Sequence, residues 1–283
     1  MTIPYKAECM ADGIHLLGIH SEFNVGTWVF ESGGECAVME MPEGTEGEPH
    51  PSLQVSQFIK DKGWNLKYLL LSHPHLDHLA GIDDYRNQFP NADFSVHYSV
   101  PLFLRISEHY WGSGKGQKMP DIKNVKVWEN IKRERGLQWF LSFFNRILPE
   151  DINTLKLGGE PLYMIYGPKH SLADMHHIFK GVWFPGDWWM GKGDPCVDRA
   201  SSSKAVDSIE RLVNFCDSIN YKIHSIFPAH ANNMMKNIDF KAVLKETSDY
   251  HKQFDADNVD DLGWKDFCIR TFYYYTFQKE FKK

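Results

Sequence analysis

The chain has 283 residues, of which 42% are hydrophobic and 24% charged, a composition typical of a soluble globular protein. This length suits one large α/β domain about as well as two small ones, and a core of this size is stable without disulfides. The net charge of −6 argues against a nucleic-acid partner, because binding to phosphates needs clustered Lys and Arg side chains.

The cysteines and the apolar runs restrict the cellular setting. The five cysteines are scattered and contain no CxxC pair, which predicts reduced structural thiols rather than disulfides or a cysteine-based metal site. The N-terminal residues show no basic stretch followed by an apolar run, and no apolar run is long enough to cross a bilayer. We therefore expect a cytoplasmic protein without a membrane partner.

The first hundred residues contain short β-like runs separated by turns and by one helix. Apolar residues from Leu53 to Ile59 fall at roughly helical spacing, and Gly63 ends that helix. A helix or turn is also expected before Tyr85. Such an alternation of strands, loops and helices indicates an α/β architecture. The expected strands cover residues 13–17, 27–30, 36–39, 67–72 and 94–97.

The second half of the chain continues the alternation after a segment that is harder to interpret. Between Trp139 and Leu148, six apolar residues form one wide helix face, typical of a core helix or, alternatively, of a lid or partner-binding helix. We expect one domain over residues 1–283, with a lid or extra helices inserted at about 102–160. Further strands are expected at 161–166, 177–179, 181–184 and 223–227, and helices at about 202–219 and 240–254.

The strongest chemical signal is the segment His73-x-His75-x-Asp77-His78, which directly follows an apolar strand. Three imidazoles and one carboxylate within six residues form a ligand set for a first-row metal ion. In an extended or tightly turned segment, His73 and His75 project the same way, while Asp77 and His78 turn toward a second, adjacent point. So many ligands at this spacing are hard to explain as structural residues.

The remaining ligands of such a site must come from the ends of other strands. Three later residues qualify, because each follows an expected strand and a turn that contains proline. They are His170, Asp187 and His230. Taken singly, Pro and Gly before a polar residue indicate only a turn. Together with the first segment, the order and chemistry of these residues become specific.

With these residues in this order, the sequence resembles the metallo-β-lactamase superfamily from about Gly13 to Phe254. That family is similar in its HxHxDH segment, a later His, a Gly-Asp pair and a final Pro-x-His. The run from His170 to Asp174, followed by a strand, is similar to a functionally mixed branch with an HxxxD segment. The resemblance implies an α/β (α+β) fold, the four-layer αββα sandwich, with metals at one edge between its two sheets.

The resemblance also implies how the ligands divide between two divalent metal ions. One ion would bind His73, His75 and His170, the second would bind Asp77, His78 and His230, and Asp187 would bridge both. Two cations about 3.5–4 Å apart can share one hydroxide that is a nucleophile at neutral pH. Asp77 is also the candidate catalytic residue, which orients the water or protonates the leaving group. Zinc is the expected metal, with iron or manganese as alternatives.

Two departures from the family pattern concern the surroundings of the ligands. Where the family often has an Asp after an early strand, this chain offers Glu40, which either substitutes for it or leaves the metal loop with a different support. The third-histidine segment has Ser-Leu-Ala in place of Thr-Pro-Gly. Asp174 is either a support for a ligand imidazole or a turn carboxylate. Trp188 and Trp189 either line a substrate pocket or pack in the core.

These features favour a metal-dependent hydrolase that cleaves a small-molecule ester, lactone, thioester or amide bond. An iron-dependent redox enzyme on the same fold is the main alternative. A nuclease fits the acidic charge poorly, and a relative without catalysis fits poorly with a full set of ligands. The expected partner is a small-molecule substrate. The oligomeric state stays open, since the aromatic residues Phe272–Phe277 either pack on the core or form a homodimer contact.

Overall fold

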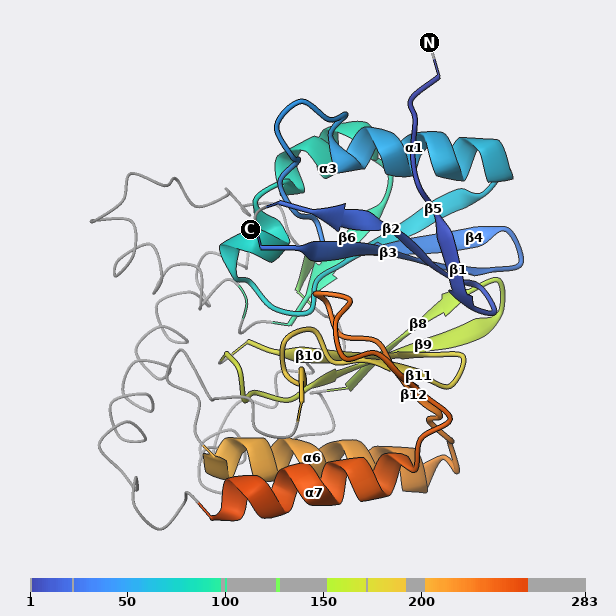
Figure 1. The fold of residues 1–283 in the computed structure, drawn as a ribbon. Helices are drawn as coiled ribbons and strands as arrows, with labels where there is room; N and C mark the ends of the chain where they lie inside the picture. Colours follow the sequence, from blue (N-terminus) through green and yellow to red (C-terminus); the bar gives the residue numbers. More distant parts are fainter. Residues whose placement is uncertain are drawn as a thin grey trace, which may run out of the picture.

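The structure, a computed structural model, describes residues 2–21, 23–97, 100, 126–127, 152–171, 173–191 and 202–253. These residues form four layers, in which two sheets face each other and helices cover the outer face of each (Figure 1). This arrangement is the predicted αββα sandwich. Within the described ranges, no helix is both long and apolar enough to cross a membrane.

The first sheet has seven strands that lie side by side in chain order. Pairing is antiparallel from β1 to β4 and parallel from β4 to β7. The parallel strands β4 and β5 both end at the same edge of the sheet, which brings the segments that follow them together. The strands are β1 (Glu8–Ala11), β2 (Ile14–His20), β3 (Val25–Ser32), β4 (Glu35–Met39), β5 (Asn65–Leu70), β6 (Asp93–Val96) and β7 (Lys126–Val127).

The second sheet has six strands, in the order β13-β12-β11-β10-β9-β8. Only the β11–β12 pair is parallel among its described pairs. All five residues of β10 are buried, including both His176 and His177. Neighbouring residues of a strand point to opposite faces, so both imidazoles are buried because both faces of this sheet are covered. The strands are β8 (Ile152–Leu157), β9 (Glu160–Tyr166), β10 (Met175–Phe179), β11 (Val182–Phe184), β12 (Ser225–Ile226) and β13 (Met235–Lys236).

Helices cover the outer faces of both sheets (Figure 1). On the first sheet lie α1 (Pro51–Lys62) and α3 (Ile82–Gln88), and the short α2 (Leu76–Leu79) precedes α3. On the second sheet lie α6 (Ser202–Ser218) and α7 (Phe240–Lys252). Helix α1 ends, as predicted, at Gly63, whose φ of 68° is the left-handed conformation that a C-terminal cap requires.

Aromatic side chains fill the space between the sheets. Trp28 on β3 stacks on Phe227, with ring centroids 5.5 Å apart, and meets Phe184 edge-on at 5.5 Å. Two backbone hydrogen bonds also join the layers at this end, from Gly26 N to the Ala229 carbonyl (2.8 Å) and from Met175 N to the Ser72 carbonyl (2.7 Å). The two sheets are therefore held in register at the edge where the candidate ligands lie.

Most predicted elements are present, with differences at their ends. The strand expected at 223–227 is limited to β12, and the short edge strands β1 and β13 were not predicted. Strand β8, near the end of the expected 102–160 insertion, pairs with β9 as part of the second sheet. The apolar helix expected at 139–148 lies outside the described residues, as does the aromatic segment 272–277.

Candidate metal centre

All seven predicted ligands lie together at one edge of the sandwich. They form three overlapping groups, and within each group the potential ligand atoms lie within 4.8 Å of one another. The groups are His73, His75 and His170; His73, His78 and Asp187; and Asp77, His78 and His230. His73 and His230 thus meet at one place, although they lie 157 positions apart in the chain.

The first group brings three imidazole nitrogens to one point. Nε2 of His73 and Nε2 of His170 lie 2.9 Å and 3.0 Å from Nδ1 of His75. A neutral imidazole donates from one nitrogen only, so His75 Nδ1 cannot form a good hydrogen bond with both neighbours at once. All three nitrogens can, however, direct lone pairs at one cation. This group therefore suits a metal ion better than it suits mutual hydrogen bonding.

The group of Asp77, His78 and His230, called the second group below, combines one carboxylate with two imidazoles. Oδ2 of Asp77 lies 3.3 Å from Nε2 of His78 and 3.8 Å from Nε2 of His230. The HxHxDH segment therefore sends its first two histidines to one group and its last two residues to the other, as predicted. The change of direction occurs because His75 is the last extended residue and α2 begins directly after it.

Asp187 lies between the two groups. Its Oδ2 is 3.0 Å from Nε2 of His230 and 3.4 Å from Nε2 of His78. The same oxygen is 3.7 Å from Nε2 of His170 and 3.9 Å from Nε2 of His73. Its Oδ1 is buried and has no hydrogen-bond partner among the described residues. One carboxylate oxygen thus faces both groups, which is the geometry that a bridging ligand needs.

The charges of the centre favour a cation. Burial lowers the pKa of His78, but the carboxylates of Asp187 and Glu40 outweigh burial and hold that pKa well above its usual value. Burial raises the pKa of Asp187, but His78 and His230 outweigh it and hold that pKa well below the usual range. Positive charge at this point therefore stabilises the buried carboxylates, and either a proton or a divalent cation can supply it.

The imidazoles of His73 and His170 are neutral at pH 7. Burial, followed by the nearby His78 and His75, holds the pKa of His73 well below its usual value. Burial, followed by His75, lowers the pKa of His170 to about 4. Both side chains are therefore neutral at pH 7, which is the form of histidine that binds metals.

The segment that carries Asp77 and His78 is fixed against the end of β4. Met41 N donates to the His78 carbonyl, and Gly81 N donates to the Met41 carbonyl, both at 2.9 Å. A Cβ atom at Gly81 would lie 2.3 Å from the Pro42 carbonyl oxygen, so only glycine fits there. These contacts hold the short helix α2, and with it both ligands, in one place.

Glu40 supports His78 from the side away from the other ligands. Its Oε2 lies 3.4 Å from Nδ1 of His78, and both side chains are completely buried. Glu40 also has a φ of 67°, in the left-handed region that non-glycine residues rarely adopt. Glu40, which stands where the family often has an Asp, therefore contacts a ligand of the centre. This contact keeps Nε2 of His78 directed inward.

Two further contacts orient ligand imidazoles. Nδ1 of His73 lies 3.0 Å from Oγ of Ser72, and Nδ1 of His230 donates to the Phe23 carbonyl at 2.7 Å. With Nδ1 donating to this carbonyl, Nε2 of His230 points at Oδ2 of Asp187, 3.0 Å away, where the neutral imidazole can bind a cation that both residues share. Neither contact was predicted. Ser72 could have been noticed beside a ligand, whereas a main-chain carbonyl such as that of Phe23 leaves no trace in the sequence.

Asp174 shapes the loop that carries His170. Its carboxylate accepts hydrogen bonds from the backbone N–H groups of Lys169 and Ser171, each at 2.8 Å, and from Oγ of Ser171 at 2.6 Å. Burial raises the pKa of Asp174 to about 6, against the effect of these hydrogen bonds. These contacts favour the interpretation as a turn carboxylate, which acts on His170 through the backbone on both sides of it.

The two tryptophans after Asp187 are buried. Trp188 is completely buried and meets His176 and Trp183 edge-on, with ring centroids 5.0 Å and 5.7 Å away. Trp189 is 5% exposed and belongs to the same apolar cluster, between the second sheet and its helices. This burial favours core packing over a role in lining a substrate pocket.

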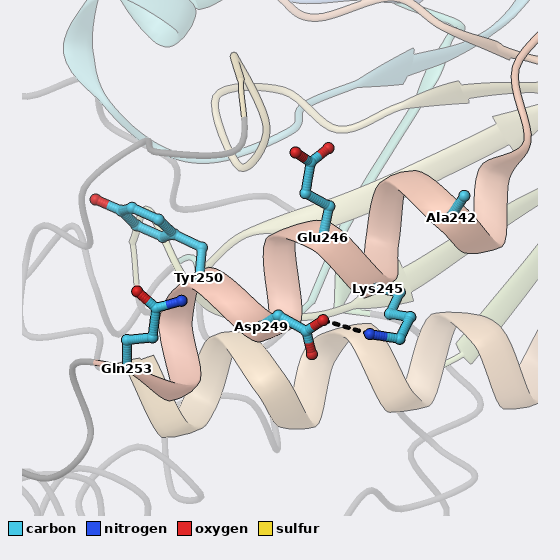
Figure 2. Close-up of a pocket in the computed structure, with 6 residues that line it drawn as sticks. All are labelled: Ala242, Lys245, Glu246, Asp249, Tyr250 and Gln253. Atoms are coloured by element: carbon cyan, nitrogen blue, oxygen red, sulfur yellow. Dashed lines mark hydrogen bonds and ion pairs between the residues drawn. The ribbon is translucent and has the colours of Figure 1, made fainter.

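In the part of the chain that the structure describes, the centre is open on the side of three ligands. The side chains of His170, His230 and Asp77 are 13%, 16% and 19% exposed, whereas those of His73 and His78 are 1% and 0% exposed. With respect to the described residues, a substrate can therefore approach past the first three of these. A separate hollow lies on α7 (Figure 2), and it contains none of the seven ligands. It is lined by Ala242, Lys245, Glu246, Asp249, Tyr250 and Gln253.

Comparisons of sequence place these observations among known proteins. A family model described as the metallo-beta-lactamase superfamily matches residues 27–215. A hydroxyacylglutathione hydrolase of Cereibacter sphaeroides is 30% identical over 79 residues, which cover 26% of this chain and 28% of that protein. The probable metallo-hydrolase YqgX of Bacillus subtilis is 31% identical over 65 residues, covering 23% of this chain and 25% of that protein. The chain thus matches about a quarter of the length of these curated relatives.

Solved structures agree with the fold. The DIM-1 metallo-beta-lactamase superposes with a TM-score of 0.58 at 14% identity, covering 89% of this chain and 98% of that one. A metallo-beta-lactamase from Pontibacter korlensis gives a TM-score of 0.58 at 12% identity, covering 88% and 99%. At such identities the likeness concerns the fold alone, and it confirms the predicted αββα architecture.

Proposed function

Because the chain belongs to the metallo-β-lactamase superfamily, a superfamily of metallo-hydrolases, we propose that it is a binuclear hydrolase of small-molecule ester, lactone, thioester or amide bonds. One observation carries the proposal: a single oxygen of Asp187 faces both groups of ligands, 3.0 Å from His230 and 3.7 Å from His170. A mononuclear site has no need of an oxygen placed in this way.

The residues fit two divalent ions. His73, His75 and His170 offer three imidazole nitrogens to one ion, and Asp77, His78 and His230 offer two nitrogens and an oxygen to the other. The buried Oδ1 of Asp187 has no hydrogen-bond partner among the described residues, which fits a carboxylate that binds a cation. Zinc suits this mixed set of imidazole and carboxylate ligands. When bound, the two ions supply a hydroxide nucleophile at neutral pH and polarise the bond to be cleaved.

Asp77 is the residue that we assign to proton transfer. It lies on the open side of the centre, and its Oδ2 faces His78 at 3.3 Å. Burial raises its pKa, but the hydrogen bond to His78 and the charges of His78 and His75 together outweigh burial, so the pKa is lowered overall. Asp77 is therefore ionised at pH 7, so that it accepts a proton from the attacking water and then delivers it to the leaving group.

The substrate class follows from the chemistry of the centre and from one relative. Thioesters come first among the candidates, because a hydroxyacylglutathione hydrolase is among the similar proteins, although the match covers only 28% of it. Lactones, other esters and β-lactams follow. A small-molecule partner and a cytoplasmic location belong to the same proposal. The net charge of −6 continues to argue against a nuclease.

The test is metal content measured together with activity. Protein purified without added metal is analysed for zinc, iron and manganese, and is assayed on thioesters, lactones and β-lactams. Asp187→Asn removes the bridging charge, and Asp217→Asn, at an exposed aspartate that pairs with Lys241, is the matched control. We expect about two zinc ions per chain in the wild type and the control, and a loss of metal and activity in Asp187→Asn. Stoichiometric iron would favour the redox alternative, and a protein that cannot be loaded with metal would overturn the proposal.

A further inference from the structure

Lys169, which directly precedes the ligand His170, is completely buried. Lysine is almost never fully buried unless its ammonium group is paired. Here Nζ donates to the main-chain carbonyl of Trp188 at 2.6 Å and lies 5.1 Å from the centroid of the Trp188 ring system. Trp188 directly follows Asp187. One side chain therefore joins the residue before one candidate ligand to the residue after another.

The other anchors of the His170 loop lead elsewhere. Arg211 and Ser208, both on α6, donate to the carbonyls of Tyr166 and Pro168 at 2.7 Å and 2.9 Å. Asp174 binds the backbone N–H groups on both sides of His170. These contacts fix the loop to α6 and to the start of β10. The contact from Lys169 instead ties it to the loop after β11, which carries Asp187.

The distance between these two loops matters for the centre. Nε2 of His170 and Oδ2 of Asp187 lie 3.7 Å apart, and both would bind the first ion. Metal–ligand distances tolerate only a few tenths of an ångström, so a small shift of one loop against the other spoils the coordination. Strand β10 separates β9 from β11 within the sheet, so the two loops do not follow neighbouring strands.

We propose that Lys169 is a positioning residue that fixes the separation of His170 and Asp187 and thereby sets the affinity for the first metal ion. The inference rests on the proposed function, because it assumes that these ligands bind a metal. The buried ammonium is suited to this task, since a charge-assisted hydrogen bond is stronger and shorter than a neutral one. The indole face beneath Nζ adds a cation–π contact that holds the side chain in place.

The test compares Lys169→Met with Lys180→Met. Methionine matches the length of lysine but cannot donate. Lys180 is a suitable control, because its Nζ likewise lies near a short-range partner, Asp12 at 2.9 Å, and near a ring, that of Phe179 at 5.6 Å. It lies in the β10–β11 turn, at the end of β10 opposite to the ligands. Metal affinity is measured by competition with a chelator, and the geometry of the first site by the absorption spectrum of the cobalt-loaded protein.

We expect Lys169→Met to bind the first ion about 10–100-fold more weakly and to change the cobalt spectrum, and Lys180→Met to change neither. Lys169→Arg keeps a charged donor and should stay within about threefold of the wild type; it decides the question if the methionine variant does not fold. If folded Lys169→Arg loses as much affinity as the methionine variant is expected to lose, the inference is wrong. If the wild type binds two ions and folded Lys169→Met binds them equally tightly, Lys169 is a packing residue and the proposed function still stands. If the wild type binds none, the proposed function itself fails.

Discussion

Replacing Glu40 should weaken the binding of the second metal ion without affecting the first. Glu40 faces Nδ1 of His78 at 3.4 Å, and neither side chain is exposed. Glu40→Ala removes the carboxylate and leaves the imidazole without the group that keeps its Nε2 directed inward. His78 lies with Asp77 and His230 in the group that would bind the second ion, and it also lies near His73 and Asp187. The group of three imidazoles that would bind the first ion does not include it.

The size of the effect follows from the geometry. Hydrogen bonds to charged groups contribute about 1.5–3 kcal/mol. At 3.4 Å the contact is an ion pair rather than a well-formed hydrogen bond, so the lower figure applies. About 1.4 kcal/mol corresponds to a tenfold change in affinity, and we therefore expect the second ion to bind about 10-fold more weakly.

A second variant separates the side chain from the backbone. Glu40 has a φ of 67°, which strains alanine as much as glutamate but suits glycine. Glu40→Gly should therefore lose the same metal affinity as Glu40→Ala. Its free energy of unfolding should, however, be about 1 kcal/mol higher than that of the alanine variant. Glu35→Ala, at the start of the strand β4 that ends just before Glu40, removes a carboxylate paired with Lys67 and should bind both ions like the wild type.

The assay is a zinc titration against a chelator that resolves two binding steps, combined with urea unfolding of the metal-free proteins. The reasoning fails if Glu40→Ala binds the second ion as tightly as the wild type. It also fails if the weakened step is the binding of the first ion, because Glu40 contacts no imidazole of that group among the contacts described for it.

Three further changes test the surroundings of the centre. Gly186→Ala should lower the free energy of unfolding by about 1–3 kcal/mol and reduce the zinc content, because the added Cβ would lie 2.4 Å from the Cβ of Ser72. An unchanged midpoint of urea unfolding would contradict this. Trp28→Ala should lower the free energy of unfolding by about 3–5 kcal/mol, and a smaller loss would mean that the inter-sheet core can collapse around the gap. Burial lowers the pKa of His177 to about 3, so the wild type loses stability as pH falls below the unfolded value of 6.5. His177→Leu lacks this loss, and its unfolding free energy relative to the wild type should rise between pH 6.5 and 5 by up to about 1.4 kcal/mol per unit; parallel pH profiles would count against a neutral buried imidazole.

The sequence by itself determined the elements and the identity of the candidate ligands. Strand and helix periods, and stop signals such as Gly63, depend on neighbours within a few residues, so they could be predicted without a fold. The HxHxDH segment is equally local. Its spacing, together with a helix that begins directly after His75, sends its two halves in different directions.

Only the tertiary structure decided how distant residues meet. The approach of one Asp187 oxygen to both groups, the ion pair of Glu40 with His78, and the link from Lys169 to Trp188 join segments that lie far apart in the chain. The burial of both His176 and His177 likewise depends on layers that cover both faces of the second sheet. Such contacts arise from the packing of the sheets face to face and from the loops at their shared edge, and no local pattern of residues encodes the distances between them.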